Sequence, residues 1–114
     1  IKTYVVEPAH SAFLSGDPPQ PHRLQGIGNS FMPDTLDVSV IDKIIKVDEE
    51  ECFDMAREIA SLEGIPAGIS SGAALRGLIE AARMPGNQDK MIVTILASSA
   101  DRYISTDLFA PFSE

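Results

Sequence analysis

Residues 63–74 read Glu-Gly-Ile-Pro-Ala-Gly-Ile-Ser-Ser-Gly-Ala-Ala, and this stretch decides how the chain folds. Gly64 can adopt the left-handed conformation that ends a preceding helix, and Pro66 prevents that helix from continuing. Residues 65–69 then predict a short, buried, extended segment. The two serines that follow are expected to cap a second helix, whose first turn carries unusually small side chains.

Ser70 and Ser71 therefore stand where a helix begins and few side chains obstruct its start. Free backbone N–H groups and two hydroxyls at such a point allow a ligand to approach closely. The same pattern also fits a helix that is simply capped and packs tightly on a sheet. The residues alone leave both interpretations open.

Length and charge exclude several classes of protein. The chain has 114 residues, enough for one domain, and its net charge of −8 argues against nucleic acid or an anionic membrane as a partner. The single cysteine, Cys52, excludes an internal disulfide and favours a reducing, cytoplasmic location. His10 and His22 lack the spacing of metal ligands, so we predict no metal site.

The first third of the chain predicts one strand followed by a long loop. Residues 4–6 (Tyr-Val-Val) are typical of a buried strand, which Glu-Pro ends. Residues 9–35 contain too many glycines and prolines for a useful helix. Within this loop, the glycines of residues 25–28 (Gln-Gly-Ile-Gly) let the backbone bend sharply and approach a neighbour. This stretch is either a surface loop or a lid over a ligand, and it is far short of a dinucleotide-binding fingerprint.

A strand and a helix are expected next. Residues 44–47 predict a strand, and Asp48 followed by Glu51 has the form of a capping box. Apolar spacing extends the helix over residues 49–63. We interpret the acidic residues of its first turn as a solvated helix end rather than a metal or catalytic site, because they complement the helix dipole.

The last third predicts a helix and a central strand. Residues 91–96 (Met-Ile-Val-Thr-Ile-Leu) are typical of a parallel strand covered on both faces, and residues 97–103 follow at the edge where open α/β sheets bind ligands. The alternation of strands and helices predicts an α/β fold with a parallel sheet. The helix before this strand should end at residues 85–87 and bury a face formed by Leu75, Leu78, Ile79 and Ala82.

Six stretches keep one characteristic order and spacing along nearly the whole chain: residues 6–8, 15–16, 21–28, 63–65, 68–74 and 102–106. Together they make the sequence similar to the C-terminal part of cysteine synthase, also called O-acetylserine sulfhydrylase. The resemblance implies a parallel-sheet three-layer sandwich of the fold-type II pyridoxal-phosphate (PLP) enzymes, the tryptophan synthase β-like type. It also implies that residues 1–114 form the C-terminal segment of that domain.

The resemblance assigns site residues as well. It implies that Ser70 contacts the pyridine nitrogen of pyridoxal 5'-phosphate, and that Gln25, Gly26, Ile27 and Gly28 form a loop at the mouth of the active site. A serine hydroxyl, unlike a carboxylate, does not hold a proton on the ring. The ring is then a weaker electron sink, which suits β-elimination.

The activity implied is the synthesis of L-cysteine and acetate from O-acetyl-L-serine and sulfide. In the family, the lysine that forms the Schiff base and the phosphate-binding loop lie in an N-terminal part. None of the lysines here stands in a matching motif, so we expect no catalytic residue in this segment and no activity from it alone. The opening at Ile1 likewise suggests a piece of a longer enzyme, in a family whose members are dimers.

Three alternatives remain. Cystathionine β-synthase and serine/threonine dehydratase share the fold, although residues 25–28 favour cysteine synthase. A non-catalytic docking module, or pseudoenzyme, would instead bind a partner such as the C-terminal tail of serine acetyltransferase. Ala97, Ala100 and Asp101 depart from the usual proline, glycine and glutamate, which leaves the substrate and the turn after the last strand open.

Overall fold

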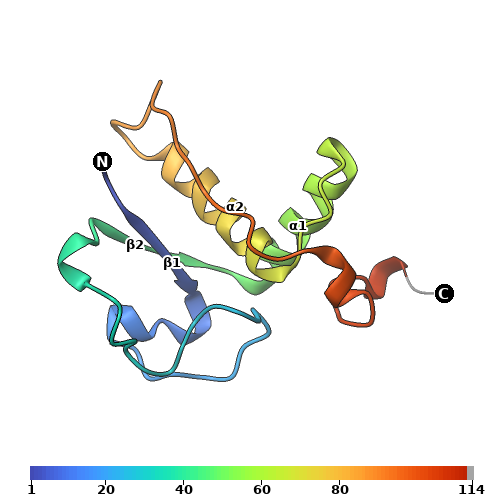
Figure 1. Cartoon of the computed structure of the whole chain (residues 1–114), viewed down its shortest axis with the longest axis horizontal. Coiled ribbons are helices and arrows are strands. Elements are labelled where there is room, and N and C mark those ends of the chain that lie inside the picture. Colours follow the sequence, from blue (N-terminus) through green and yellow to red (C-terminus); the bar gives the residue numbers. More distant parts are fainter. Residues whose placement is uncertain (113–114) are drawn as a thin grey trace.

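The computed structural model of the chain describes residues 1–112 and shows an α/β arrangement (Figure 1). Strands β1 (Tyr4–Pro8) and β2 (Lys43–Val47) form a parallel two-stranded sheet, as the sequence predicts. Helix α2 (Ile69–Arg83) packs against both strands and against helix α1 (Glu49–Glu63). Among these residues, no helix is both long and apolar enough to cross a bilayer. Short 3-10 helices cover Ala9–Ser11, Phe13–Ser15, Val38–Val40, Ala100–Tyr103 and Ala110–Phe112.

Helix α1 has the bounds predicted from the sequence. The carboxylate of Asp48 accepts hydrogen bonds from the backbone N–H groups of Glu50 at 2.9 Å and Glu51 at 3.3 Å. Gly64 ends the helix with a φ of +68°, in the left-handed region. The carboxylate of Glu51 accepts from Nε of Arg76 on α2 at 3.0 Å, so its side chain ties the two helices together.

The prediction that Ser70 and Ser71 cap α2 is wrong. Gly68 is the N-cap residue, and both serines lie within the first turn of the helix. A β-carbon at Gly68 would come within 2.6 Å of Ser98 Oγ and of the Tyr103 ring, so a side chain does not fit there. The buried extended segment predicted for residues 65–69 is also shorter than expected. Ile65 is exposed, and Ile69 already belongs to α2. Ala67 makes an isolated antiparallel bridge to Ser99.

The buried face of α2 is also not the predicted one. Leu75, Leu78 and Ile79 are half-buried and Ala82 is exposed. A β-carbon at Gly72 would overlap the carbonyl oxygen of Cys52 on α1, and α2 approaches β1 just as closely at Gly77. Only small residues allow this approach, so close packing rather than hydrophobic bulk determines which face is inside. The residues that are fully buried on α2 are Ile69, Ser71, Gly72, Ala73, Gly77 and Ala81.

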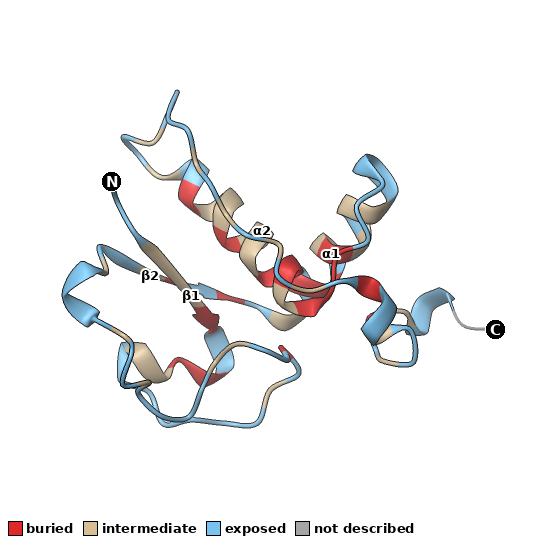
Figure 2. Cartoon of the chain, in the orientation of Figure 1, coloured by how far each residue is buried: buried red, intermediate tan, exposed pale blue. Residues whose placement is uncertain are grey.

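Residues 91–96, here called the edge segment, do not form the predicted central strand. Within residues 1–112 the segment pairs with no strand, although it alternates in exposure as a strand would (Figure 2). Met91, Val93 and Ile95 are 92%, 81% and 79% exposed, whereas Ile92 packs against the core. A strand needs a hydrogen-bonded neighbour, and the edge segment has none in the described chain.

The core lies where α1, α2 and β2 meet. Phe53 of α1 is buried at its centre, and two residues remote in sequence close it from the loops, Leu24 and Leu108. Because Leu24 is completely buried, the long loop after β1 is fixed to the core just before residues 25–28. The fold therefore brings this loop to the beginning of α2.

Candidate active-site wall

Ser70 lies in the first turn of α2 and is half-buried. Ser70 Oγ lies 2.8 Å from Ser98 Oγ, at hydrogen-bonding distance. Ser98 lies two residues after the end of the edge segment and was not among the site residues predicted from the sequence. The available signal was its place in residues 97–103, the stretch expected to lie at the ligand-binding edge of the sheet.

Ser70, Ser71 and Ser98 together form a group that we call the serine cluster. Ser71 is completely buried; its Oγ donates to the carbonyl oxygen of Ser98 at 2.8 Å and accepts from the Ser98 N–H at 3.0 Å. The N–H of Ser71 donates to Ser98 Oγ at 3.1 Å. These bonds fix the start of α2 to the chain that follows the edge segment.

The loop residue Gly26 lies directly against Ser70. A β-carbon placed on Gly26 would lie 3.6 Å from Ser70 Cβ and 3.7 Å from Ser70 Oγ, an ordinary contact distance. Gly26 has a φ of +93°, which disfavours other residues for a conformational reason rather than for lack of space. The two parts of the site predicted from the sequence therefore meet, while Gln25 is exposed and Ile27 is half-buried against the core.

His22 braces this loop from within. Its Nδ1 accepts a hydrogen bond from the Leu24 N–H at 3.2 Å, and its Nε2 lies 3.1 Å from the carbonyl oxygen of Gly28. Because a carbonyl only accepts, Nε2 must carry the proton, and the two bonds select one neutral tautomer. At Gly28 a β-carbon would lie 2.6 Å from Pro8 and 2.7 Å from His22 Nε2, so the position requires glycine.

Arg23 holds the outer side of the same loop. Its guanidinium makes ion pairs with Glu49 at 2.9 Å, with Glu50 and with Asp107 at 3.3 Å, and it lies 4.8 Å from the centre of the Phe53 ring. The hydrogen bonds that Arg23 donates to Glu50 and then to Glu49 raise the pKa of Arg23. Burial alone would raise the pKa of Glu49, but its hydrogen bonds with Arg23 lower it.

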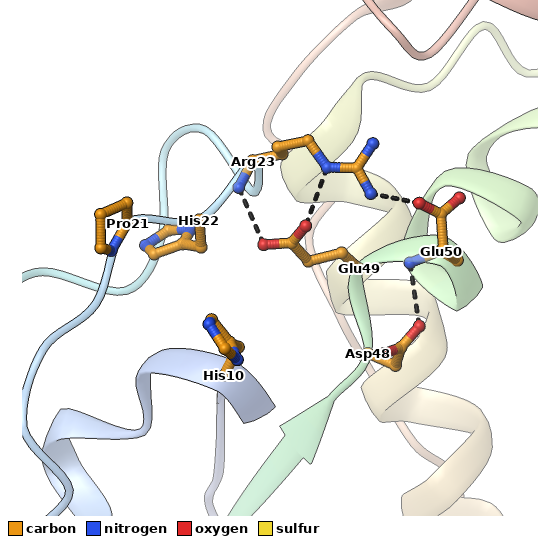
Figure 3. Close-up of a pocket in the computed structure, with 7 residues that line it drawn as sticks. All are labelled: His10, Pro21, His22, Arg23, Asp48, Glu49 and Glu50. Carbon is orange, nitrogen blue, oxygen red and sulfur yellow. Dashed lines mark hydrogen bonds and ion pairs between the residues drawn. The ribbon is translucent and has the colours of Figure 1, made fainter.

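A cavity of about 520 Å³ lies beside this ion-pair network (Figure 3). Of its acidic residues, Glu49 and Glu50 are paired with Arg23 and Asp48 caps α1, and neither Ser70 nor Gly26 lines the cavity. It is therefore separate from the serine cluster, and we assign it no ligand. The residues that line it are His10, Pro21, His22, Arg23, Asp48, Glu49 and Glu50.

Cys52 is not a nucleophile in this structure, in agreement with its interpretation from the sequence. The side chain is completely buried beneath α2. Burial, and then the negative charges of Asp48 and Glu51, raise the pKa of the Cys52 thiol to about 12. A thiol protonated at neutral pH and closed off from solvent does not attack a substrate.

The chemistry of the serine cluster suits an aromatic nitrogen. A hydroxyl can donate to a neutral ring nitrogen or accept from a protonated one. The residues present therefore fit the ring of PLP, and Ser70 is the side chain that would contact its nitrogen.

Comparison with known proteins agrees with this geometry. The family of pyridoxal-phosphate dependent enzymes matches residues 1–98. A cysteine synthase of Staphylococcus aureus is 46% identical over 110 residues, which are 96% of this chain and 35% of that protein.

Solved structures of enzymes with related names are similar to this chain in fold as well as in sequence. A cysteine synthase from Entamoeba histolytica has a TM-score of 0.92 at 42% identity, over 96% of this chain and 32% of that one. An O-acetylserine dependent cystathionine β-synthase from Helicobacter pylori has a TM-score of 0.80 at 37% identity, over 96% of this chain and 35% of that one. The chain thus has the fold of the corresponding part of these enzymes and spans about a third of their length.

Proposed function

Because the chain belongs to the family of pyridoxal-phosphate dependent enzymes, we propose that it is the C-terminal segment of a cysteine synthase. The whole enzyme would make L-cysteine and acetate from O-acetyl-L-serine and sulfide. The observation that carries the proposal is the contact between the loop at Gly26 and the hydroxyl-bearing start of α2 at Ser70. Contact between these two motifs of the resemblance supports the proposal that they share one wall of the site.

In this proposal Ser70 is the cofactor contact and residues 25–28 contact the substrate. The cofactor, when bound, supplies the electron sink for removal of the α-proton and the β-substituent. Ser70 would hold the ring nitrogen by a neutral hydrogen bond, which leaves the nitrogen without a full positive charge. His22 would keep the loop in place beside Ser70.

The proposal assigns residues 1–114 to one wall of the site and assigns the lysine and the phosphate-binding loop to an N-terminal part of the same enzyme. The length of the relatives supports this division, since the chain matches about a third of them. The exposed apolar side chains of the edge segment supply a surface on which the N-terminal part can pack. We therefore expect the isolated segment to be inactive.

Further features of the proposal follow the resemblance alone. We propose a cytoplasmic homodimer, because cysteine synthases resemble this chain in sequence along almost its whole length. The C-terminal tail of serine acetyltransferase is the proposed protein partner. Its carboxylate would meet the same loop that contacts the substrate.

A chimera tests the proposed function directly. Residues 1–114 would replace the matching part of the Staphylococcus aureus cysteine synthase, and cysteine formation from O-acetyl-L-serine and sulfide would be measured. We expect the purified chimera to bind PLP and to retain kcat/KM within about tenfold of the parent, a difference of about 1.4 kcal/mol in the barrier. Isolated residues 1–114 serve as the inactive control.

Two results would replace the proposal by an alternative. A folded, PLP-bound chimera that uses homocysteine in preference to sulfide would be a cystathionine β-synthase, for which the similarity to the Helicobacter pylori enzyme is the specific support. A folded, PLP-bound chimera that turns over neither substrate, but binds a peptide with a free C-terminal carboxylate, would be a docking module. Either result would show that residues 1–114 do not support cysteine synthesis.

A further inference from the structure

Ser98 is placed to control the hydroxyl of Ser70, and this inference rests on the proposed role of Ser70. The two oxygens lie 2.8 Å apart, and Ser98 comes from a different part of the chain. Ser98 is held firmly, because both its N–H and its carbonyl oxygen are bonded to the buried Ser71. Its hydroxyl is therefore the fixed partner that Ser70 meets.

The number of protons in the serine cluster restricts how it can be arranged. Ser71 has one hydroxyl proton, which is donated to the carbonyl oxygen of Ser98 at 2.8 Å. Ser98 Oγ accepts the backbone N–H of Ser71 at 3.1 Å and keeps its own proton for another acceptor. The acceptors within reach are Ser70 Oγ at 2.8 Å and Ser71 Oγ at 3.0 Å.

Two arrangements of these protons are possible without moving any heavy atom. The first is the arrangement that the structure shows for the bond between Ser70 and Ser98: Ser70 donates to Ser98, Ser98 donates to Ser71, and Ser70 presents only lone pairs to a ligand. In the second, Ser98 donates to Ser70, and the proton of Ser70 is free to be donated outward. The second arrangement suits a ring nitrogen without a proton, because such a nitrogen is only an acceptor.

We propose that Ser98 is a positioning residue that makes Ser70 a hydrogen-bond donor to the ring nitrogen of the cofactor. In the structure Ser70 donates to Ser98. If the Ser70 proton turns to the ring nitrogen, the chain of donors would run from the Ser71 N–H to Ser98 Oγ, then to Ser70 Oγ and on to the nitrogen. It begins at a backbone N–H in the first turn of α2, where the helix dipole is positive. Each bond polarises the next, which strengthens the donation by Ser70 and disfavours a proton on the ring.

The test uses the PLP-bound chimera with a nitrogen-labelled cofactor. Ser98→Ala should shift the NMR signal of the pyridine nitrogen and weaken PLP binding by about 3- to 10-fold, the effect of one neutral hydrogen bond. Ser99→Ala is the matched control: it removes a hydroxyl from the adjacent, exposed residue and should leave both values unchanged. If Ser98→Ala prevents folding, Ser98→Cys, whose S–H is a weak donor of similar shape, takes its place.

A double-mutant cycle separates positioning from a merely structural role. Because Ser98 acts through Ser70, Ser98→Ala should have no further effect on the nitrogen signal in a Ser70→Ala background. An equal shift in both backgrounds, or no shift in the wild-type background, would overturn the proposal. If Ser70→Ala itself leaves the nitrogen signal unchanged, the assignment of Ser70 as the cofactor contact fails instead.

Discussion

The serine cluster lies beside the edge segment through Ser98, yet the cluster has all its hydrogen-bond partners within residues 1–112 and the edge segment does not. In the serine cluster each hydroxyl has a protein partner, and every buried side-chain polar atom in these residues is bonded. In the edge segment, apolar side chains at alternate positions face solvent. The start of α2 finds its partner in Ser98, which the described chain supplies, whereas the edge segment lacks the neighbouring strand that a strand needs. The chain thus holds a fully hydrogen-bonded serine cluster beside an apolar segment that has no partner strand in residues 1–112.

The largest expected effect comes from placing a charge on the edge segment. Ile95→Lys in the chimera should reduce the yield of PLP-bound enzyme about 100-fold, because packing of the N-terminal part would bury an unpaired ammonium group. Leu62→Lys is the matched control, since Leu62 is 76% exposed and Ile95 is 79% exposed. The comparison of the two regions fails if both variants assemble equally well, as judged by PLP absorbance after gel filtration.

A smaller effect is expected where α2 touches α1. Gly72→Ala would push a methyl group against the Cys52 carbonyl oxygen, which is rigid backbone. Such overpacking should cost about 2 kcal/mol, more than the gain of about 1 kcal/mol from replacing glycine in a helix. Gly77→Ala meets the end of the Val6 side chain instead and should cost less. Urea unfolding of the chimera would measure the loss of stability in both variants. Equal losses would contradict the claim that close packing against the α1 backbone is the reason for glycine at position 72.

The loop beside the serine cluster depends on His22. His22→Ala removes the bonds to Leu24 and Gly28, so we expect faster hydrogen exchange in residues 22–28 and a stability loss of about 1–2 kcal/mol. KM for O-acetyl-L-serine should rise more than kcat falls. His10→Ala, at an exposed position, is the control. Unchanged hydrogen exchange in residues 22–28 of the His22 variant would show that His22 does not hold the loop in place.

The smallest effect is a pH dependence of the Arg23 network. Hydrogen bonds with Arg23 lower the pKa of Glu49 below its usual 4.5, so the folded state binds this proton less readily than the unfolded state. The stability that Glu49 contributes is therefore present above pH 4.5 and is lost as the pH falls through the lowered pKa. Glu49→Gln should flatten this part of the curve of unfolding midpoint against pH. A curve of the same shape in the variant would show that Glu49 does not cause this loss of stability at low pH.

The features predicted correctly from the sequence are those with local causes. Helix α1 has its predicted bounds because Asp48 and Gly64 act on their nearest neighbours. The buried face of α2 was predicted wrongly because residues such as Gly72 are buried through their contacts with α1, which periodicity of bulky side chains does not reveal. The edge segment has the composition of a central strand, but the described chain supplies no partner for it.

The candidate site shows the same division. The family resemblance named Ser70 and residues 25–28, and the fold brings Gly26 to Ser70. Ser98 and His22 escaped notice as site residues because their importance depends on which backbone groups lie across from them. No spacing rule contains that information. A serine pair after an apolar run was the available signal for Ser98.

The central claim is that the Ser70 hydroxyl binds the pyridine nitrogen of PLP. It is tested most directly by the NMR signal of that nitrogen in the labelled, PLP-bound chimera and in its Ser70→Asp variant. We predict an unprotonated nitrogen in the chimera, and a protonated one with slower cysteine formation in the variant, because a carboxylate holds a proton on the ring. The same nitrogen signal and the same turnover in both proteins would contradict the account.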